Sequence, residues 1–310
     1  MNIHAGAKIG AQFTCEVFSA DNTLREKSGV SKNLVLDSGL ARMSVGGWAT
    51  HLLVGSSSAA PNVSQTSMMQ FVAATTNIVG ANVVRELDPV KPYFKCTRVY
   101  RFAQGAAAGN LAEIGIGWAS NACWNRALIR DANGDPTVLT ILSDEFLQVT
   151  VEVLIYPMVE SRTTINLVDK IGATISTHEL HTRVAMPLRF AGWDAGRVEL
   201  YVRGYSENGG FIFNTGMTED MTTYPEINLI ADGRHMTGGN TYPTPTSVQS
   251  VKSIGLDDAN GTHRLLVMGV QHMLLFDSLY YKTEIIPPIV KTADATMKYT
   301  FNFTWSRLEE

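Results

Sequence analysis

Strict alternation of large apolar and polar residues marks the last segment of the chain. Between residues 297 and 305, the odd positions hold Met, Tyr, Phe, Phe and Trp, and the even positions hold Lys, Thr, Asn and Thr. Side chains of a β-strand point to opposite faces in turn, so this pattern predicts a long strand with one buried face. Residues 147–155 follow the same rule, with Leu, Val, Val, Val and Ile at the odd positions.

These two segments also resemble each other in detail. Residues 144–151 align without a gap with residues 294–301, and both begin with Asp and carry an apolar residue, a polar residue and a Thr at matching places. The match indicates a weak internal repeat, although two unrelated amphipathic strands can look alike. We therefore expect an N-terminal β domain over residues 1–160 and a C-terminal β domain over residues 161–310.

Alternating patterns predict further strands along the chain, while helical periodicity is scarce. They lie at residues 12–18, 94–102, 111–118, 127–130, 163–168, 181–185 and 197–203. A short helix is expected to begin near Asp37 or Ser38, which both favour helix caps. The tetrapeptide Asp-Ala-Asn-Gly occurs at 131–134 and 258–261 and predicts hairpin turns, and residues 217–245 are expected to form a long exposed loop. This pattern is typical of an all-β protein, with antiparallel β-sandwich or barrel-like domains and few short helices.

Composition narrows the classes of function. The 310 residues are 45% hydrophobic and 17% charged, with a formal net charge of −4, so a folded core is expected and a general nucleic-acid binder is not. No apolar run approaches the ~18 residues of a membrane helix, and the start of the chain lacks the pattern of a signal peptide. Cys15, Cys96 and Cys123 lack metal-binding spacing, and Cys15 and Cys96 are interpreted as small core residues, which suits a protein made in a reducing cytosol.

Candidate chemistry is sparse. The segment at 131–135 resembles a calcium loop, but its twelfth position is Leu142 and its flanks are strand-like, which favours a hairpin turn. His178 and His181 would share a face only on a helix, so a zinc site is not expected. No nucleophile elbow, phosphate loop or dinucleotide fingerprint occurs. A glycosidase needs two carboxylates close together, and the sequence does not show that any two of Asp144, Glu145, Glu152, Asp194 and Glu199 meet in the fold. The sequence therefore predicts no catalytic, cofactor-binding or metal-binding residues.

Aromatic residues in the loop-rich second half are the one suggestive class of side chain. Exposed aromatic side chains can stack on sugars or anchor protein interfaces, although many serve only as core and loop anchors. The candidates for such contacts are Tyr205, Phe211, Phe213, Tyr224 and Tyr242.

Several segments of the first half resemble tailed-bacteriophage tail and tail-fibre-associated proteins. They are residues 33–40 (NLVLDSGL), 53–61 (LVGSSSAAP), 98–118, 127–136 and 144–157. These motifs are structural, so no active-site residue is implied. The resemblance implies a virion protein made in the host bacterial cytoplasm, and it leaves open whether that protein is a fibre, adaptor, collar or capsid decoration component.

The leading hypothesis is a non-enzymatic virion structural protein of the tail or of the tail-fibre or collar region. Polar sheet faces and free strand edges suit a homo-oligomer, such as a trimer or a ring, that docks to other virion proteins. The alternatives are a receptor-binding module that recognises host surface glycan and a capsid decoration protein. A glycan-cleaving tailspike ranks last because the sequence shows no short solenoid period.

Overall fold

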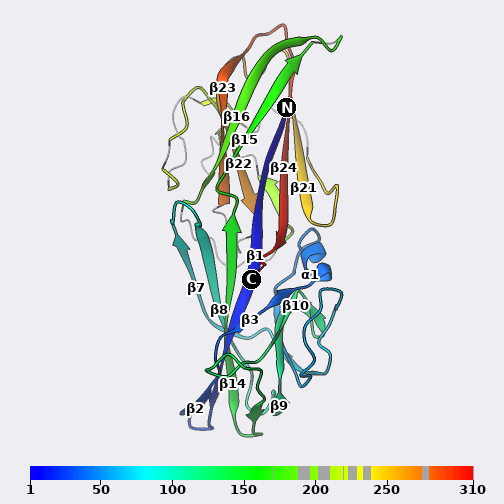
Figure 1. Cartoon of the computed structure of the whole chain (residues 1–310), viewed down its shortest axis with the longest axis vertical. Helices are drawn as coiled ribbons and strands as arrows, with labels where there is room; N and C mark the ends of the chain where they lie inside the picture. The colour runs from blue at the N-terminus through cyan, green and yellow to red at the C-terminus, as the bar shows by residue number, and fades with distance from the viewer. Residues whose placement is uncertain are drawn as a thin grey trace.

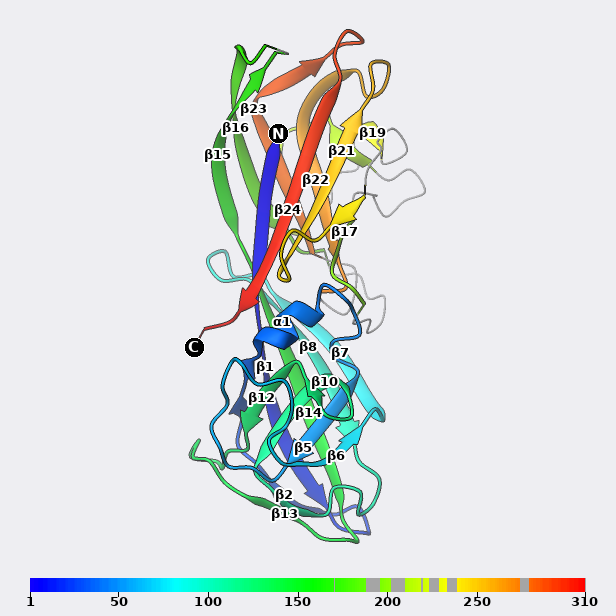
Figure 2. The same ribbon diagram turned by 90° about the vertical axis from the view of Figure 1, so that its right-hand side faces the viewer.

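The computed structural model describes residues 1–169, 171–187, 196–201, 210–218, 220–222, 229–232, 239–273 and 279–309 (Figure 1). Side chains are described for these residues except 201, 210, 211 and 229–232. Within this part of the chain, the secondary structure consists of β-strands and a single short helix. The predicted all-β class is confirmed, and the strands form an elongated body with an upper and a lower half (Figures 1 and 2).

One sheet, here called the long sheet, runs through both halves of the molecule. Along its main path the strand order is β20-β21-β24-β1-β14-β8-β7, and β2 and β3 pair with β1. Its described strands are β1 (Asn2–Phe18), β2 (Leu24–Lys27), β3 (Ser31–Lys32), β7 (Ile78–Glu86), β8 (Tyr93–Arg101), β14 (Phe146–Pro157), β20 (Asn240–Thr241), β21 (Ser247–Ile254) and β24 (Met297–Arg307).

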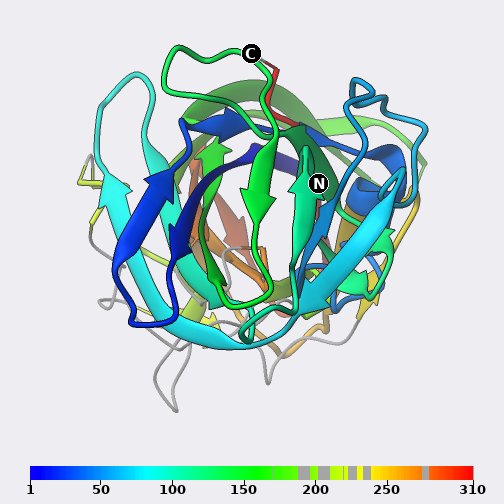
Figure 3. The same cartoon turned by 90° about the horizontal axis from the view of Figure 1, so that it is seen from below.

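Two further sheets pack against the long sheet, one in each half. The lower sheet has β4 (Leu34–Val35), β5 (His51–Gly55), β6 (Phe71–Thr75), β10 (Glu113–Ala119), β11 (Ala122–Cys123) and β12 (Asn125–Leu128). The upper sheet has β15 (Glu160–Val168), β16 (Thr174–Ala185), β17 (Glu199–Tyr201), β18 (Gly210–Phe213), β19 (Leu229–Asp232), β22 (Gly261–Gln271) and β23 (Leu279–Lys291). A small ribbon joins β9 (Gly109–Leu111) to β13 (Leu139–Ile141). Seen from below, the strands of the lower half surround a common axis in a barrel-like ring (Figure 3).

Strand β1 connects the two halves. Its first part pairs in parallel with β24, from Asn2 opposite Thr300 to Ile9 opposite Arg307, and its second part pairs antiparallel with β14. The two alternating segments that suggested an internal repeat are therefore the two neighbours of β1. The expected boundary near residue 160 falls between β14 and β15, whereas β1 from the first half and β24 from the second half share one sheet.

The predicted alternation is confirmed in β14 and β24. In β14, every odd position from Leu147 to Ile155 is fully buried, and in β24 the side chains from Tyr299 to Trp305 follow the same rule. The sequence reading found only the second part of β1, because Ala and Gly at residues 5–7 and 10–11 are weak strand formers. Ala5, Gly6 and Ala7 nevertheless alternate in burial, whereas Gly10 and Ala11 are both buried.

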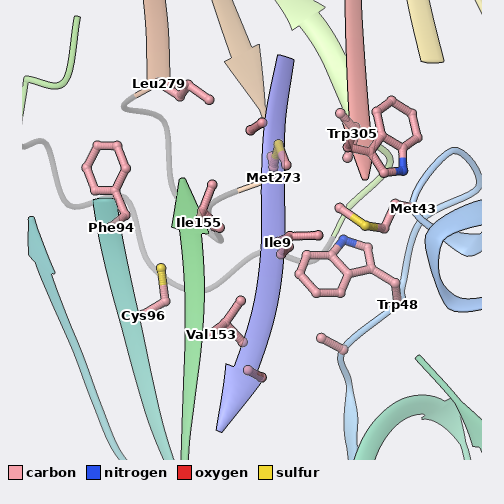
Figure 4. Packing of buried hydrophobic residues seen from close by; sticks show 14 of the residues in the cluster. Ile9, Met43, Trp48, Phe94, Cys96, Val153, Ile155, Met273, Leu279 and Trp305 are labelled. Atoms are coloured by element: carbon pink, nitrogen blue, oxygen red, sulfur yellow. The ribbon is translucent and has the colours of Figure 1, made fainter. Parts of the chain in front are cut away.

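A continuous apolar core links the halves (Figure 4). At their junction Ile9 of β1 lies between Trp48 and Met43 on one side and Val153 and Ile155 of β14 on the other, as the close view shows. Cys15, Cys96 and Cys123 are free and buried. The burial of Cys15 and Cys96 fits their predicted role as core residues, and burial raises the pKa of Cys15 and Cys123 to about 12.

Some local expectations need correction. The helix α1 (Asp37–Arg42) begins where expected, but its N-cap is Leu36, which has no side-chain acceptor, and the carboxylate of Asp37 pairs with Arg307. The segment 217–245 is not entirely loop, since β19 and β20 lie within it. Strand β7 carries Gly80, Ala81 and Asn82, and its alternation is too weak to be recognised from the sequence.

A buried histidine joins β22 to β24. The Nε2–H of His263 donates to the carbonyl of Ala259 at 2.7 Å, so Nδ1 accepts a hydrogen bond from the Tyr299 hydroxyl at 2.5 Å. Burial lowers the pKa of His263, and the nearby ammonium of Lys291 lowers it further, against the effect of the Ala259 carbonyl. The neutral imidazole is therefore the form that the fold holds.

We expect His263 to make stability depend on pH. Its pKa is below the unfolded value of about 6.5, so the unfolded chain takes up a proton first as the pH falls. The stabilisation is present above pH ~6.5 and decreases as the pH falls below that value. Urea unfolding of the wild type and of His263→Gln, measured between pH 5 and 7.5, should show a steeper loss for the wild type at acid pH. Parallel curves for the two proteins would contradict this expectation.

Candidate functional site

A large hollow among the described residues lies at the upper end of the molecule, where the upper sheet and the long sheet separate. It has a volume of about 1000 Å³ and is bordered by the β15–β16 hairpin, the end of β23 and the start of β24. Its apolar lining is contributed mainly by Leu167, Val168, Ile175, Ile289 and Met297. Hollows of this size and character are the usual places for ligands or partner side chains.

The polar side of this upper hollow contains a Ser–His pair that the sequence reading missed. Ser176 and His178 lie two residues apart on the same face of β16, and the Ser176 Oγ is 2.6 Å from Nε2 of His178. The other ring nitrogen, Nδ1, donates to the carbonyl of Pro287 in β23, also at 2.6 Å. The only sequence signal for this pair was the S-x-H spacing within a strand.

The pair meets one geometric requirement of nucleophilic catalysis, because a hydroxyl contacts a base that a third group orients. Acyl transfer also needs donors for an oxyanion. The buried ammonium of Lys291, which lines the same hollow, donates instead to Leu256 O, Asn260 Oδ1 and Thr292 O. His178 is only 4% exposed. The arrangement therefore fits a link between β16 and β23 better than it fits turnover.

Exposed aliphatic side chains gather around this hollow. Val168, Ile171 and Ile175 on the β15–β16 hairpin and Val290 on β23 are all more than half exposed, and Ile171 reaches 88%. The hairpin turn is held by Asp169, whose carboxylate accepts the N–H groups of Ile171 and Ala173. We call these four aliphatic residues the apolar tip. Apolar groups clustered on a surface mark a contact site more often than isolated ones do.

The aromatic residues predicted as a contact loop do not form one site among the described residues. Tyr205 and Tyr224 lie outside those residues, as does the side chain of Phe211. Phe213 is buried in a small core cluster with Leu265, Val267 and Tyr280, so it cannot serve as an exposed contact. The expectation that Phe213 lies on an exposed loop is wrong, because β18 pairs with β22 and directs this ring inward.

Tyr242 is half-buried and has a structural role. Its hydroxyl donates to the carbonyl of Val198 at 2.9 Å, and the guanidinium carbon of Arg197 lies 5.0 Å from its ring centroid. Burial raises the pKa of Tyr242, and the positive charge of Arg197 opposes that rise. These contacts tie the segment before β17 to the segment after β20.

The other candidate residues have structural partners. The Asp131 carboxylate accepts the N–H groups of Asn133 and Asp135, and Gly134 has a positive φ of 88°, so the predicted hairpin turn is confirmed. Glu145 accepts the N–H of Leu142 and pairs with Arg25, and Glu152 pairs with Lys95. Asp194 lies outside the described residues. Across the described part of the chain, no group of three or more His, Cys, Asp or Glu side chains could hold a metal ion.

Comparison of the chain with models of protein families, with curated proteins and with solved structures found no match. In the ranges that the structure describes, none of the helical segments is long and apolar enough to cross a membrane.

Proposed function

We propose that this chain is a non-enzymatic structural protein of a tailed-bacteriophage virion, located in the tail or in the tail-fibre or collar region. It assembles as a homo-oligomer and docks to other virion proteins. The observation that supports assembly most directly is the free edge of β7. The assignment to a virion rests on the resemblance of the segments between residues 33 and 157.

Strand β7 is the last strand at one end of the long sheet. Within the described residues it pairs with β8 alone, from Ile78 to Glu86, with a bulge at Val79. Its side chains project on both faces, and Val79 and Val84 are 52% and 45% exposed. Lysine, proline or a covering loop usually protects a long edge from pairing. Here aliphatic side chains flank unpaired backbone groups, which favours pairing with another chain.

A second free edge occurs on the upper sheet. Strand β15 also has nine residues and, among the described strands, pairs only with β16. Glu160 at the start of this strand lies near Arg162, His181 and Arg183, whereas the charged residues of β7, Arg85 and Glu86, are confined to its last two positions. Charged side chains are a common protection of an edge, so we place the contact between copies at β7. Contacts repeated between identical chains usually close into a ring with rotational symmetry.

Introducing charge along β7 should dissociate the assembly. We expect the wild type to show a mass of several 33.9 kDa chains in light scattering at micromolar concentration, and the double variant Val79→Lys, Val84→Lys to show the mass of one chain. Two lysines on each copy would repel their counterparts or lose hydration at the contact. Both valines are exposed, so circular dichroism should show an intact fold.

Val90→Lys is the matched control, because Val90 is 83% exposed in the loop between β7 and β8 and lies off the strand. That variant should keep the wild-type mass. A wild-type protein that is monomeric at micromolar concentration, or a double variant that assembles normally, would overturn the proposal.

The apolar tip and the upper hollow support docking to other proteins of the particle. The β15–β16 hairpin, which carries three residues of the apolar tip and borders the upper hollow, lies at the end of the long axis of the molecule, far from β7 (Figures 1 and 2). A contact between copies through β7 would leave this end accessible for a different partner.

A further inference from the structure

A pair of tyrosines on the outer face of the long sheet forms the centre of a second surface. Tyr156 of β14 and Tyr93 of β8 are half-buried, with ring centroids 5.3 Å apart and planes tilted by 37°. Lys8 of β1 lies directly opposite Tyr156 in the sheet register, so both side chains are on the same face. The ammonium of the exposed Lys91 is 5.0 Å from the centroid of the Tyr156 ring.

Tyr156 separates two hollows and lines both. The first has a volume of about 460 Å³ and is bordered by Gly6, Lys8, Met158 and Ser306. The second has a volume of about 360 Å³ and is bordered by residues that include Gly10, Gln12, Lys32 and Lys91. Both volumes are at the lower end of the range for small-molecule sites, roughly 300–1,000 Å³.

Two glycines leave these hollows open. Gly6 and Gly10 occupy outward positions of β1 on either side of Lys8, one in each hollow. A β-carbon at Gly6 would lie only 3.0 Å from the carbonyl oxygen of Thr304, so the backbone packing there suits glycine. The outer face of the sheet is therefore recessed on both sides of the Lys8–Tyr156 pair.

The charge around the two hollows is positive although the chain as a whole is negative. Lys8, Lys32 and Lys91 border the hollows, and Glu309 is the one carboxylate among the lining residues of the two. Glu152 lies nearby, but its carboxylate accepts a hydrogen bond from Gln12 and pairs with Lys95 at 2.9 Å. The formal net charge of the whole chain is −4, so this surface is a local exception.

We propose that this surface binds an acidic saccharide, with neighbouring sugar rings seated in the two hollows on either side of Tyr156. The apolar C–H face of a sugar packs against an aromatic ring, and a carboxylate on the sugar meets the ammonium groups of Lys8 and Lys91. The side-chain carbonyl of Gln12, whose Nε2–H donates to Glu152, and the Ser306 hydroxyl supply partners for sugar hydroxyls. The site does not depend on assembly through β7, because its residues lie on the face of the sheet and not on that edge.

Single-stranded nucleic acid also binds to aromatic and basic groups, but it needs a groove that follows several phosphates. Here the hollows are short, and Glu152 and Glu309 lie close to the lysines. We therefore assign the surface to a saccharide and include an oligonucleotide in the test as a competitor.

The test is calorimetric titration of the full chain with three probes. They are an oligomer of galacturonic acid, an oligomer of N-acetylneuraminic acid, and the methyl ester of the galacturonate oligomer, which keeps the rings and removes the charge. We expect at least one acidic oligomer to bind. If the galacturonate oligomer binds, its methyl ester should bind at least ~10-fold more weakly. The acidic oligomer that binds should also bind at least ~10-fold more weakly to Tyr156→Ala and to Lys8→Glu than to the wild type.

Lys298→Glu is the matched control, because it makes the same change of charge on an exposed lysine of β24 that borders the upper hollow instead. It should bind as the wild type does. Three results would each overturn the proposal. The first is absence of binding to both acidic oligomers, and the second is equal affinity of Lys8→Glu and the wild type. The third is tighter binding of an oligothymidylate that is abolished in Tyr156→Ala. Light scattering of the same samples reports assembly separately, so a failed titration with an intact oligomer contradicts the saccharide site alone.

Discussion

Replacing Arg126 with methionine should lower the free energy of unfolding by about 3–5 kcal/mol, because it leaves a buried carboxylate without its counter-charge. Arg126 and Glu113 are both fully buried, and the guanidinium Nε–H donates to the Glu113 carboxylate. The same guanidinium donates to Gln65 Oε1 at 2.9 Å and to the carbonyl of Ala59 at 2.7 Å.

Glu113 completes this arrangement from strand β10. Its two carboxylate oxygens accept the backbone N–H groups of Met69 and Gln70, at 3.2 and 2.8 Å. The pair thus holds the long connection between β5 and β6 against β10 and β12. With Arg126 removed, the carbonyl and amide oxygens of that connection lose their donors inside the protein, which adds to the cost of the unpaired charge.

Urea unfolding followed by circular dichroism provides the measurement. The matched control is Arg162→Met, which removes an arginine from an exposed group of ion pairs with Glu160 and Glu179 and should change stability little. The double variant Glu113→Gln, Arg126→Met should recover part of the loss, because it no longer buries an isolated charge. Wild-type stability of Arg126→Met would contradict this expectation, because it would show that water solvates the Glu113 carboxylate once the arginine is removed.

Gly39→Ala should destabilise the protein although alanine is the better helix former. Helix propensity alone predicts a gain of about 1 kcal/mol for this change inside α1. In the structure, a β-carbon at Gly39 would lie 2.0 Å from the carbonyl oxygen of Trp124 and 2.6 Å from its carbonyl carbon. Both atoms belong to the backbone, so the helix and the start of β12 would have to move apart. We expect a net loss of about 1–3 kcal/mol.

The control for Gly39→Ala is Ala41→Gly in the same helix. Ala41 is half-buried, and its replacement should cost about 1 kcal/mol through propensity alone. The two substitutions run in opposite chemical directions, yet both should lower the urea midpoint. A raised midpoint for Gly39→Ala would contradict the prediction, because it would show that helix propensity outweighs the contact between α1 and the Trp124 backbone.

The Gly39 contact also explains why part of the NLVLDSGL motif is structural. Leu36 and Leu40 are buried, and the carbonyl of Leu40 accepts the indole N–H of Trp305 at 2.9 Å. The motif therefore brings a short helix onto the end of β24, more than 260 positions later in the chain. From the sequence, the glycine could be recognised as part of a motif, but its partner could not be identified.

The candidate surfaces could be predicted less well than the fold. Ser176, His178 and Pro287 meet because β16 and β23 are neighbours, and Tyr156 lies beside Lys8 because β14 pairs with β1. Loop composition drew attention to Phe213 and Tyr242, whereas the half-buried tyrosine pair lies on regular strands at outward positions that are normally polar. An outward aromatic residue within a strict alternation is the signal that could have found Tyr93 and Tyr156.

The sequence by itself determined the class of fold, the inward face of the amphipathic strands and several turns. These features depend on neighbours within a few residues, since alternation and turn chemistry are local properties of the chain. Only the tertiary structure decided that β1 joins β14 to β24, that Glu113 meets Arg126 inside the lower half, and that β7 is left as an edge. Those outcomes depend on which strands become neighbours, and pairing between distant segments is set by the packing of the whole core.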